Sequence, residues 1–363
     1  MAVIWADFPS GAHGLYGTTA SYMLNGIWAA LEGFSPSVTI VADPDPLVGS
    51  AGYVLKTYAV SSGEQESRAR FALPNPAATE GIGLHLWMDS LPPDNVSCPY
   101  ISFRDAGNSV LFSVRILSNG SMEVRSTDRS TGTLLAATTG PVVTANAYNH
   151  IEIKGTSNAT TGAVEIRVNG VTKVSATGLN TGTGPIAQIG LGSYGYHIST
   201  GCTPYWKDIV FWDTSGSYAN DFLGSVSVFQ LDLDGDVSLG GWTPSTGVTG
   251  YDLLDETPPN DADYIAADAT PPAAASFTFG DLPIDVTSVT AVLPIIRAQK
   301  TDGGDCDLQT GLISGVSTQL QTNRPITTAF TYWWDVSHTD PATAAAWLPS
   351  AVDAATLQID RTL

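Results

Sequence analysis

Apolar and polar residues alternate along several short stretches of the chain. The clearest alternation spans residues 148–155 and 163–168, where apolar side chains occupy every second position. An Asn169-Gly170 pair follows the second stretch, and the alternation resumes over 171–174. A period of two is that of a strand with one buried face, and Asn-Gly favours a tight hairpin turn. The pattern therefore predicts paired antiparallel strands in this region.

Similar stretches, rich in apolar and β-branched residues, recur before residue 220 at the spacing typical of β-sandwiches. The further predicted strands span 37–41, 53–60, 68–73, 81–88, 100–104, 110–117, 121–126, 184–192 and 206–212. The stretch 23–31 fits a short helix or a bent strand, and both alternatives stay open. We expect an all-β fold, with a large antiparallel sandwich before residue 220.

A polar, glycine-bearing segment separates two systems of strands. Residues 205–213 read as an aromatic strand, whereas residues 225–231 alternate as in a half-buried strand. We expect a first domain over 1–213, a linker over 214–221 and a second, smaller β-sandwich over 222–363. The strands predicted in the second domain span 276–279, 286–297, 307–313 and 329–335, with a helical turn at 342–346.

Charged residues are few and unevenly distributed. They make up 14% of the 363 residues, and the formal net charge is −20. Residues 1–220 carry 16 acidic and 11 basic side chains, whereas residues 221–363 carry 19 acidic and 4 basic ones. Nucleic acids and anionic membranes attract basic surfaces, so this balance argues against both as partners. The low charge also favours a chain that covers part of its surface by assembly.

The cysteines and histidines give no sign of a metal or another cofactor. Cys98, Cys202 and Cys306 are too far apart for a metal-binding pattern, and their odd number makes a poor disulfide framework. They favour folding in a reducing cytosol. The first residues lack a basic segment followed by an apolar core, and no apolar run approaches the length of a membrane span. We therefore expect no cofactor, no signal peptide and no membrane insertion.

Several carboxylates are candidates for acid–base chemistry. Glu152, Glu165, Asp208 and Asp213 could supply the pair that glycoside hydrolysis needs. Glu152 and Glu165 lie at polar positions of alternating strands, where exposure to solvent is the ordinary explanation. The acidic run 232–236 lacks the glycine and the bidentate acid of a calcium loop, which favours a solvated hairpin tip. From these residues we expect no enzymatic activity.

Aromatic residues gather in a segment that reads as a long loop at the rim of the first sandwich. Tyr194, Tyr196 and His197 precede Tyr205 in this segment. Exposed rings at such a rim can stack on sugars, or they can contact another subunit or domain. The sequence leaves carbohydrate binding and a protein contact equally open.

Three strings resemble strands of a known fold. Tyr-Asn-His-Ile-Glu-Ile-Lys at 148–154 and Gly-Ala-Val-Glu-Ile-Arg-Val-Asn-Gly-Val at 162–171 resemble paired strands of concanavalin A/laminin-G-like jelly rolls. Trp-Lys-Asp-Ile-Val-Phe-Trp-Asp at 206–213 resembles their closing strand. The resemblance covers residues 1–213 and implies a jelly roll, a fold that serves lectins, glycosidases and structural modules.

A second resemblance lies after the jelly roll. Gly-Trp-Thr-Pro-Ser-Thr-Gly at 241–247, with the following segment 251–265, resembles a family of virion structural proteins of long-tailed bacteriophages. This resemblance implies a virion protein assembled in the bacterial host cytoplasm, in contact with other virion proteins. A tail-fibre or tail-tip protein that aids attachment to a host surface glycan fits best, and a head fibre is the other position. The alternative is a carbohydrate-binding module or glycosidase that acts on host surface polysaccharide.

The same resemblance, together with the sparse charge, implies a homotrimer. The strongly acidic second domain would repel its own copies, so the first domain is the better candidate for contact between subunits. Trp5, Tyr22 and Trp28 lie in its aromatic N-terminal segment and are the expected interface anchors.

Overall fold

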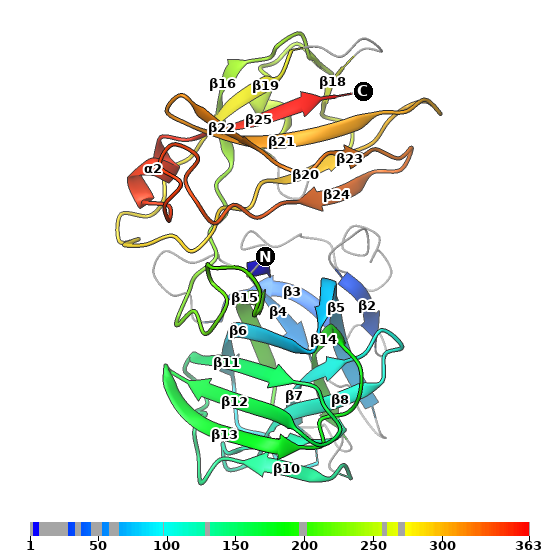
Figure 1. Cartoon of the computed structure of the whole chain (residues 1–363), viewed down its shortest axis with the longest axis vertical. Helices are drawn as coiled ribbons and strands as arrows, with labels where there is room; N and C mark the ends of the chain where they lie inside the picture. Colours follow the sequence, from blue (N-terminus) through cyan, green and yellow to red (C-terminus); the bar gives the residue numbers. More distant parts are fainter. Residues whose placement is uncertain are drawn as a thin grey trace. The chain divides into compact units, whose positions relative to one another are not determined.

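The structure is a computed structural model, and it describes residues 3–6, 28–32, 38–44, 53–57, 65–96, 98–127, 131–195, 202–255, 260–267 and 273–362. Contacts divide the chain into two units, Met1–Val228 and Phe229–Leu363. Both units consist mainly of antiparallel strands (Figure 1). Within the described ranges, no helix has the length and apolar character needed to cross a membrane.

The first unit contains two antiparallel sheets. The eight-stranded sheet has the order β13-β12-β11-β6-β15-β4-β3, with β1 paired to β15. Its strands are β1 (Val3–Ala6), β3 (Val38–Ala42), β4 (Tyr53–Thr57), β6 (Thr79–Met88), β11 (Asn149–Thr156), β12 (Gly162–Val168), β13 (Val171–Leu179) and β15 (Pro204–Asp213). The seven-stranded sheet has the order β10-β9-β8-β7-β14-β5-β2. Its strands are β2 (Trp28–Glu32), β5 (Gln65–Ala77), β7 (Cys98–Arg104), β8 (Val110–Ile116), β9 (Met122–Arg125), β10 (Leu134–Ala137) and β14 (Ile186–Gly195).

The inner faces of these two sheets form one hydrophobic core. Ile82 and Ile151 from one sheet and Phe103 and Phe112 from the other are completely buried. A Cβ atom on Gly155 of β11 would lie 2.1 Å from the ring of Phe112 on β8, so the sheets approach closely at this point. Alternate residues of each strand therefore point into the core, and the residues between them form the outer faces.

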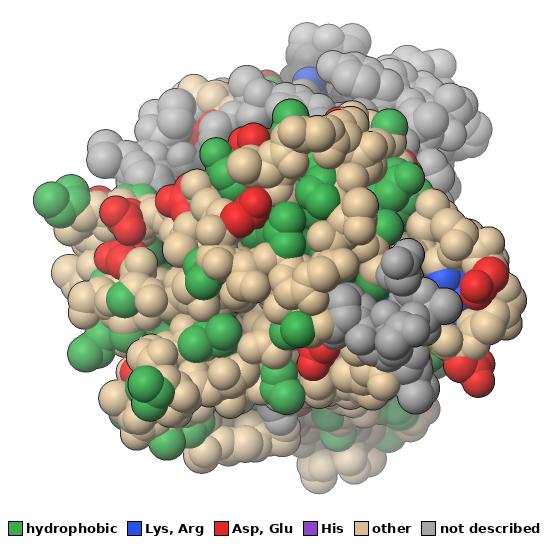
Figure 2. All heavy atoms as spheres, turned by 90° about the horizontal axis from the view of Figure 1, so that it is seen from above, with side chains coloured by type: hydrophobic (Ala, Val, Ile, Leu, Met, Phe, Trp, Pro, Cys, Tyr) green, Lys and Arg blue, Asp and Glu red, His purple; other side chains and the backbone are tan. Residues whose placement is uncertain are grey.

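The second unit is built around a six-stranded sheet of order β16-β19-β25-β21-β22, with β23 paired to β21. These strands are β16 (Leu233–Ser238), β19 (Ala275–Phe279), β21 (Asp307–Ser314), β22 (Ser317–Leu320), β23 (Arg324–Pro325) and β25 (Thr356–Arg361). Two strand pairs accompany it, β17 (Thr243–Pro244) with β18 (Ile265–Ala266) and β20 (Ile295–Ala298) with β24 (Thr331–Trp334). Buried side chains of this unit include Phe277 and Trp347. The face in Figure 2 shows acidic and apolar side chains and few basic ones.

The all-β jelly-roll architecture expected from the sequence is confirmed, but three local expectations are wrong. Residues 225–231 form no strand, and the carboxylate of Asp208 accepts the backbone N–H group of Val228 in this segment. The strand expected over 286–297 is reduced to β20. Residues 342–346 form a turn rather than a helical turn, and the short helix α2 lies at Pro349–Asp353.

The predicted interface anchors fall at the limit of what the structure describes. Trp5 lies in β1 and Trp28 in β2, but their side chains, like Tyr22 as a whole, are outside the described part of the chain. The expectation that these residues bury themselves between subunits stays a prediction.

Candidate functional site

Five arginines lie on the outer face of the seven-stranded sheet, and we call this set the arginine face. Its members are Arg68 and Arg70 of β5, Arg104 of β7, Arg115 of β8 and Arg125 of β9. They are half of the ten arginines of the chain. Each is directly adjacent in the sequence to an inward-pointing apolar residue, so the alternation of the strands directs all five away from the core.

The strand register brings four of these arginines into two rows across the sheet, Arg68 with Arg115 and Arg70 with Arg125, whereas Arg104 lies outside both rows. In the first row, Gly192 of β14 pairs with Arg68 and with Tyr100, and Tyr100 pairs in turn with Arg115. In the second row, Gly190 pairs with Arg70 and with Ser102. A Cβ atom on Gly190 would lie 2.9 Å from Cδ of Arg68, and one on Gly192 would lie 2.6 Å from the hydroxyl of Tyr100. The two glycines therefore leave room for these long side chains to lie across β14.

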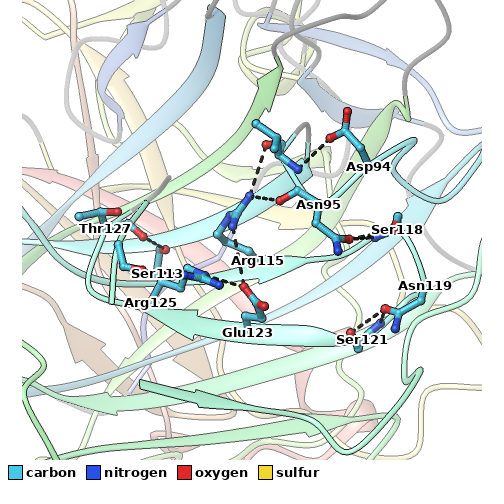
Figure 3. A network of polar contacts seen from close by, with 12 residues as sticks. Asp94, Asn95, Ser113, Arg115, Ser118, Asn119, Ser121, Glu123, Arg125 and Thr127 are labelled. Carbon is cyan, nitrogen blue, oxygen red and sulfur yellow. Dashed lines mark hydrogen bonds and ion pairs between the residues drawn. The ribbon is translucent and has the colours of Figure 1, made fainter. Parts of the chain in front are cut away.

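Arg115 is held from both sides. Its guanidinium donates to the carbonyl oxygens of Asn95 at 2.9 Å and Val96 at 3.3 Å. Glu123 Oε2 lies 3.9 Å from Arg115 Nη1 and 2.6 Å from Arg125 Nε, so one carboxylate serves both arginines (Figure 3). Arg115 is completely buried, whereas Arg125 is half-buried. The network thus fixes one guanidinium inside and leaves the next one within reach of solvent.

Neutral groups help to orient Arg104 and Arg70. Arg104 Nε donates to Ser102 Oγ at 3.0 Å, and its Nη1 donates to the carbonyl oxygen of Asn108 at 2.9 Å. Arg70 Nη1 donates to the side-chain oxygen of Gln188. Among the described outward side chains of β5, β7, β8, β9 and β14, the only carboxylate is that of Glu123. Half of the arginines in a chain of net charge −20 are therefore gathered on this face.

The aromatic residues that the sequence grouped together are separated in the structure. Tyr194 lies on β14 of the seven-stranded sheet and is 5% exposed, which leaves its ring little surface for a sugar. Tyr205 lies on β15 of the other sheet, half-buried, with its ring 5.3 Å from that of Trp87 and Lys56 Nζ 5.8 Å away. Tyr196 and His197 are outside the described residues.

The candidate acids lie mostly on the outer face of the eight-stranded sheet, and Glu152 corrects an expectation. Its carboxylate is not solvated: Glu152 is 1% exposed, and its Oε1 accepts the N–H groups of Leu223 at 2.7 Å and Gly224 at 2.9 Å. Burial raises the pKa of Glu152, although the two backbone hydrogen bonds lower it. Asp208 is buried in the same way, and its Oδ1 accepts the N–H group of Val228 at 2.9 Å.

We call residues 222–228 the strap, because these hydrogen bonds hold the segment over the sheet. Phe222 packs at its start, with its ring 3.7 Å from the guanidinium carbon of Arg167 and 6.1 Å from the ring of Trp212. Glu165 of β12 pairs with Arg167 at 2.9 Å and stays partly exposed. The sequence missed the strap because its alternation is that of a strand.

The acidic run of the second unit is part of a strand rather than a hairpin tip. Residues 233–236 lie in β16, where Asp236 accepts the N–H groups of Gly250 and Tyr251, each at 2.8 Å. Asp234 accepts a hydrogen bond from Thr278 on β19. No cluster of metal-binding side chains occurs among the residues that the structure covers.

No family model matches the chain, and no curated protein matches it. Three similar solved structures are a carbohydrate-binding module from Bacillus subtilis, the alginate lyase Aly36B and a carbohydrate esterase of the Shiga toxin-encoding bacteriophage phi24B. The first is 9% identical over 50% of this chain and 100% of the module, with a TM-score of 0.32. The lyase is 11% identical over 58% of this chain and 95% of its own, with a TM-score of 0.35. The esterase is 14% identical over 55% and 96%, with a TM-score of 0.35.

The presence of lyases and an esterase among these structures overturns the expectation that this chain is not an enzyme. That expectation took the carboxylates of alternating strands to be exposed and looked for a single local motif. Glu152 is instead buried beneath the strap, so the argument from exposure fails for this residue.

Proposed function

We propose that the first unit binds an acidic polysaccharide on the arginine face. The observation that carries this proposal is the gathering of five guanidinium groups on one side of one sheet. A guanidinium is planar and can donate two parallel hydrogen bonds to a carboxylate, the acidic group of uronic acid sugars. Neighbouring strands are about 4.8 Å apart, so Arg68 and Arg115, three strand spacings apart in the first row, present their cations about 14 Å from each other along an extended chain.

The arginines differ in exposure, so they would have different roles in such a complex. Arg70 and Arg125 are half-buried and would contact the ligand, whereas Arg104 and Arg115 are buried and would hold the face in shape. Gln188, which accepts from Arg70, keeps its amide donor for a sugar hydroxyl. Such a site combines cations, which select the acidic sugar, with neutral groups that orient it.

The test is binding of the full chain to a polyuronate, measured by calorimetry beside a neutral polysaccharide. We expect Arg70→Gln and Arg125→Gln each to weaken binding about tenfold, the effect of losing one charge-assisted hydrogen bond. Lys173→Gln is the matched control, because it removes one positive charge from exposed β13 of the other sheet. Its affinity should stay within twofold of the wild type.

Two outcomes would contradict the proposal. One is equal affinity for the acidic and the neutral polysaccharide. The other is an equal loss in Lys173→Gln and in the two arginine variants, which would indicate attraction by overall charge alone. Binding of single-stranded DNA in preference to the polyuronate would point to a nucleic acid ligand instead.

We further propose that this recognition serves attachment of a phage virion to its host, as a tail-fibre or tail-tip protein. The support is the resemblance of residues 241–265 to virion proteins of long-tailed phages. In this proposal the second unit binds other virion proteins, and the first unit meets the glycan of the host surface. Electron microscopy of particles labelled on this protein tests it, and particles without label would contradict it.

A further inference from the structure

Three residues that are distant in the sequence meet at the strap. Ser225 Oγ lies 3.0 Å from His85 Nε2, and His85 Nδ1 lies 3.1 Å from Asp208 Oδ2. Ser225 belongs to the strap, His85 to β6 and Asp208 to β15. The imidazole thus stands between a hydroxyl and a carboxylate, the order of groups found in serine hydrolases of unrelated folds.

The surroundings fix the carboxylate and the imidazole but leave the hydroxyl open. His85 is 5% and Asp208 3% exposed, whereas Ser225 is exposed. Asp208 has a φ of 50° at a β-bulge, and its other oxygen, Oδ1, accepts the N–H group of Val228. A left-handed conformation is costly for a residue other than glycine, and such strain is concentrated at functional sites. The bulge turns this carboxylate toward His85.

The contact between His85 and Asp208 is close but not aligned as a hydrogen bond. Neither His85 Nδ1 nor Asp208 Oδ2 has a hydrogen-bond partner among the described residues. Two buried polar atoms 3.1 Å apart satisfy each other when a proton on Nδ1 faces the carboxylate. That tautomer leaves Nε2 as an acceptor, directed at the hydroxyl of Ser225.

The ring beside this array adds no positive charge at neutral pH. His150 of β11 lies 5.0 Å from His85, measured between ring centroids. Burial and the neighbouring His85 lower the pKa of His150 to about 4. His150 therefore places no positive charge beside His85, and Lys207, which pairs with His85 across the sheet, forms an ion pair with Asp43 at 2.6 Å.

We propose that Ser225, His85 and Asp208 hydrolyse carboxylic esters. The Ser225 oxygen attacks the carbonyl carbon of the ester while its proton passes to His85 Nε2. The tetrahedral intermediate collapses by cleaving the bond to the alcohol oxygen, and that oxygen takes the proton from His85. Water then attacks the acyl-serine, gives a proton to His85 and releases the carboxylic acid, and the proton returns to Ser225. Asp208 stabilises the imidazolium in both halves.

The neighbouring side chains indicate the class of ester. Trp87 lies two residues from His85 on β6, on the same face, and Tyr205 pairs with Trp87 across the sheet. This half-buried aromatic pair lies about 7 Å along the strand from His85, within reach of the alcohol part of a substrate. Aromatic rings stack on sugar rings. The substrate is therefore an O-acylated sugar, and the acyl group faces Ser225.

This site is on the eight-stranded sheet, so it does not depend on polysaccharide binding by the arginine face. The test uses the full chain and a fluorophosphonate probe, which phosphonylates a serine only where a base activates it. Wild-type protein should be labelled at Ser225, as located by mass spectrometry of the peptide. It should also hydrolyse p-nitrophenyl acetate faster than the buffer does.

Variants of the same segment separate catalysis from structure. Ser225→Ala should lose the label and at least 90% of the esterase rate, whereas Ser227→Ala, at an exposed serine two residues on, should keep both. Asp208→Asn keeps an oxygen for the Val228 N–H group and should lower the labelling rate at least tenfold with Ser225 still present. Absence of label from the wild type, label on another serine, or full activity in Ser225→Ala would overturn the proposal. A polyuronate affinity unchanged in Ser225→Ala would show that the two sites are separate.

Discussion

The carboxyl group of Glu80, at the edge of the core, allows a direct test of how the stability of the first unit depends on pH. Glu80 of β6 is completely buried, two residues before Ile82, so it points into the space between the sheets. Its Oε1 accepts a hydrogen bond from the N–H group of Ala77 at 3.0 Å. Asp213 of the neighbouring strand β15 is paired with Glu80. Burial, and then the charge of Asp213, raise the pKa of Glu80 from 4.5 to about 8.

The sign and size of the effect follow from proton linkage. Because the folded pKa is above the unfolded value, folded protein binds the proton more tightly, and this stabilisation is complete below pH 4.5. It is lost as the pH rises through 8. With 1.36 kcal/mol for each unit between 4.5 and 8, the wild type loses about 3 kcal/mol by pH 7 and about 5 kcal/mol at high pH.

Glu80→Gln should remove this dependence. Glutamine keeps the oxygen that accepts from Ala77 and cannot ionise. We expect the variant to gain stability over the wild type as the pH rises, by about 3 kcal/mol between pH 4 and pH 7. Urea unfolding at a series of pH values measures this difference, and hydrogen exchange of β6 and β11 assigns it to the first unit. Glu165→Gln, at the partly exposed glutamate of β12, controls for the loss of one negative charge. A constant difference between Glu80→Gln and the wild type from pH 4 to pH 9 would refute the reasoning.

Two further predictions concern the cysteines and the assembly. Burial raises the pKa of Cys98 to about 11 and also raises the pKa of Cys202. Native protein at pH 8 should therefore react with iodoacetamide first at half-buried Cys306. Cys98 and Cys202 should react only after unfolding. We also propose that the chain forms a homotrimer through the first unit; light scattering of fragments 1–228 and 229–363 should find the first associated and the second monomeric, and the reverse result would exclude this interface.

The alternation with a period of two predicts the strands of the first unit, but it does not predict the strap that covers one of the sheets. Residues 148–155 and 163–168 alternate because β11 and β12 each bury one face, and the structure confirms them. Residues 225–231 alternate in the same way and form no strand. The difference lies in Glu152 and Asp208, whose carboxylates bind the N–H groups of the strap in place of a neighbouring strand. Alternation reports which side chains share a face, but it cannot report the partner of each backbone group.

The candidate sites could not be predicted from the sequence for a related reason. Arg68 and Arg70 are visibly on one face, since they are two residues apart, but Arg115 joins them only through the register of β14, β7 and β8. Ser225 and His85 are 140 residues apart, and a bulge at Asp208 turns the third group toward them. No local motif marks either set. The sequence supplied the residue types, and the pairing of distant strands supplied the sites.

The charge of the whole chain points away from an anionic ligand, yet the arginine face points toward one. Both inferences use Coulomb attraction, but they apply at different distances. At physiological ionic strength the screening length is about 8 Å, so exposed charges farther from a ligand than this contribute little. The sum of −20 therefore describes the mean field and not the potential at one sheet. A polyanion held by Arg70 and Arg125 would experience mainly the charges within this distance, and the described outward side chains of this sheet include five guanidinium groups and the carboxylate of Glu123. The distribution of the few basic residues, rather than their number, decides which ligand this face can bind.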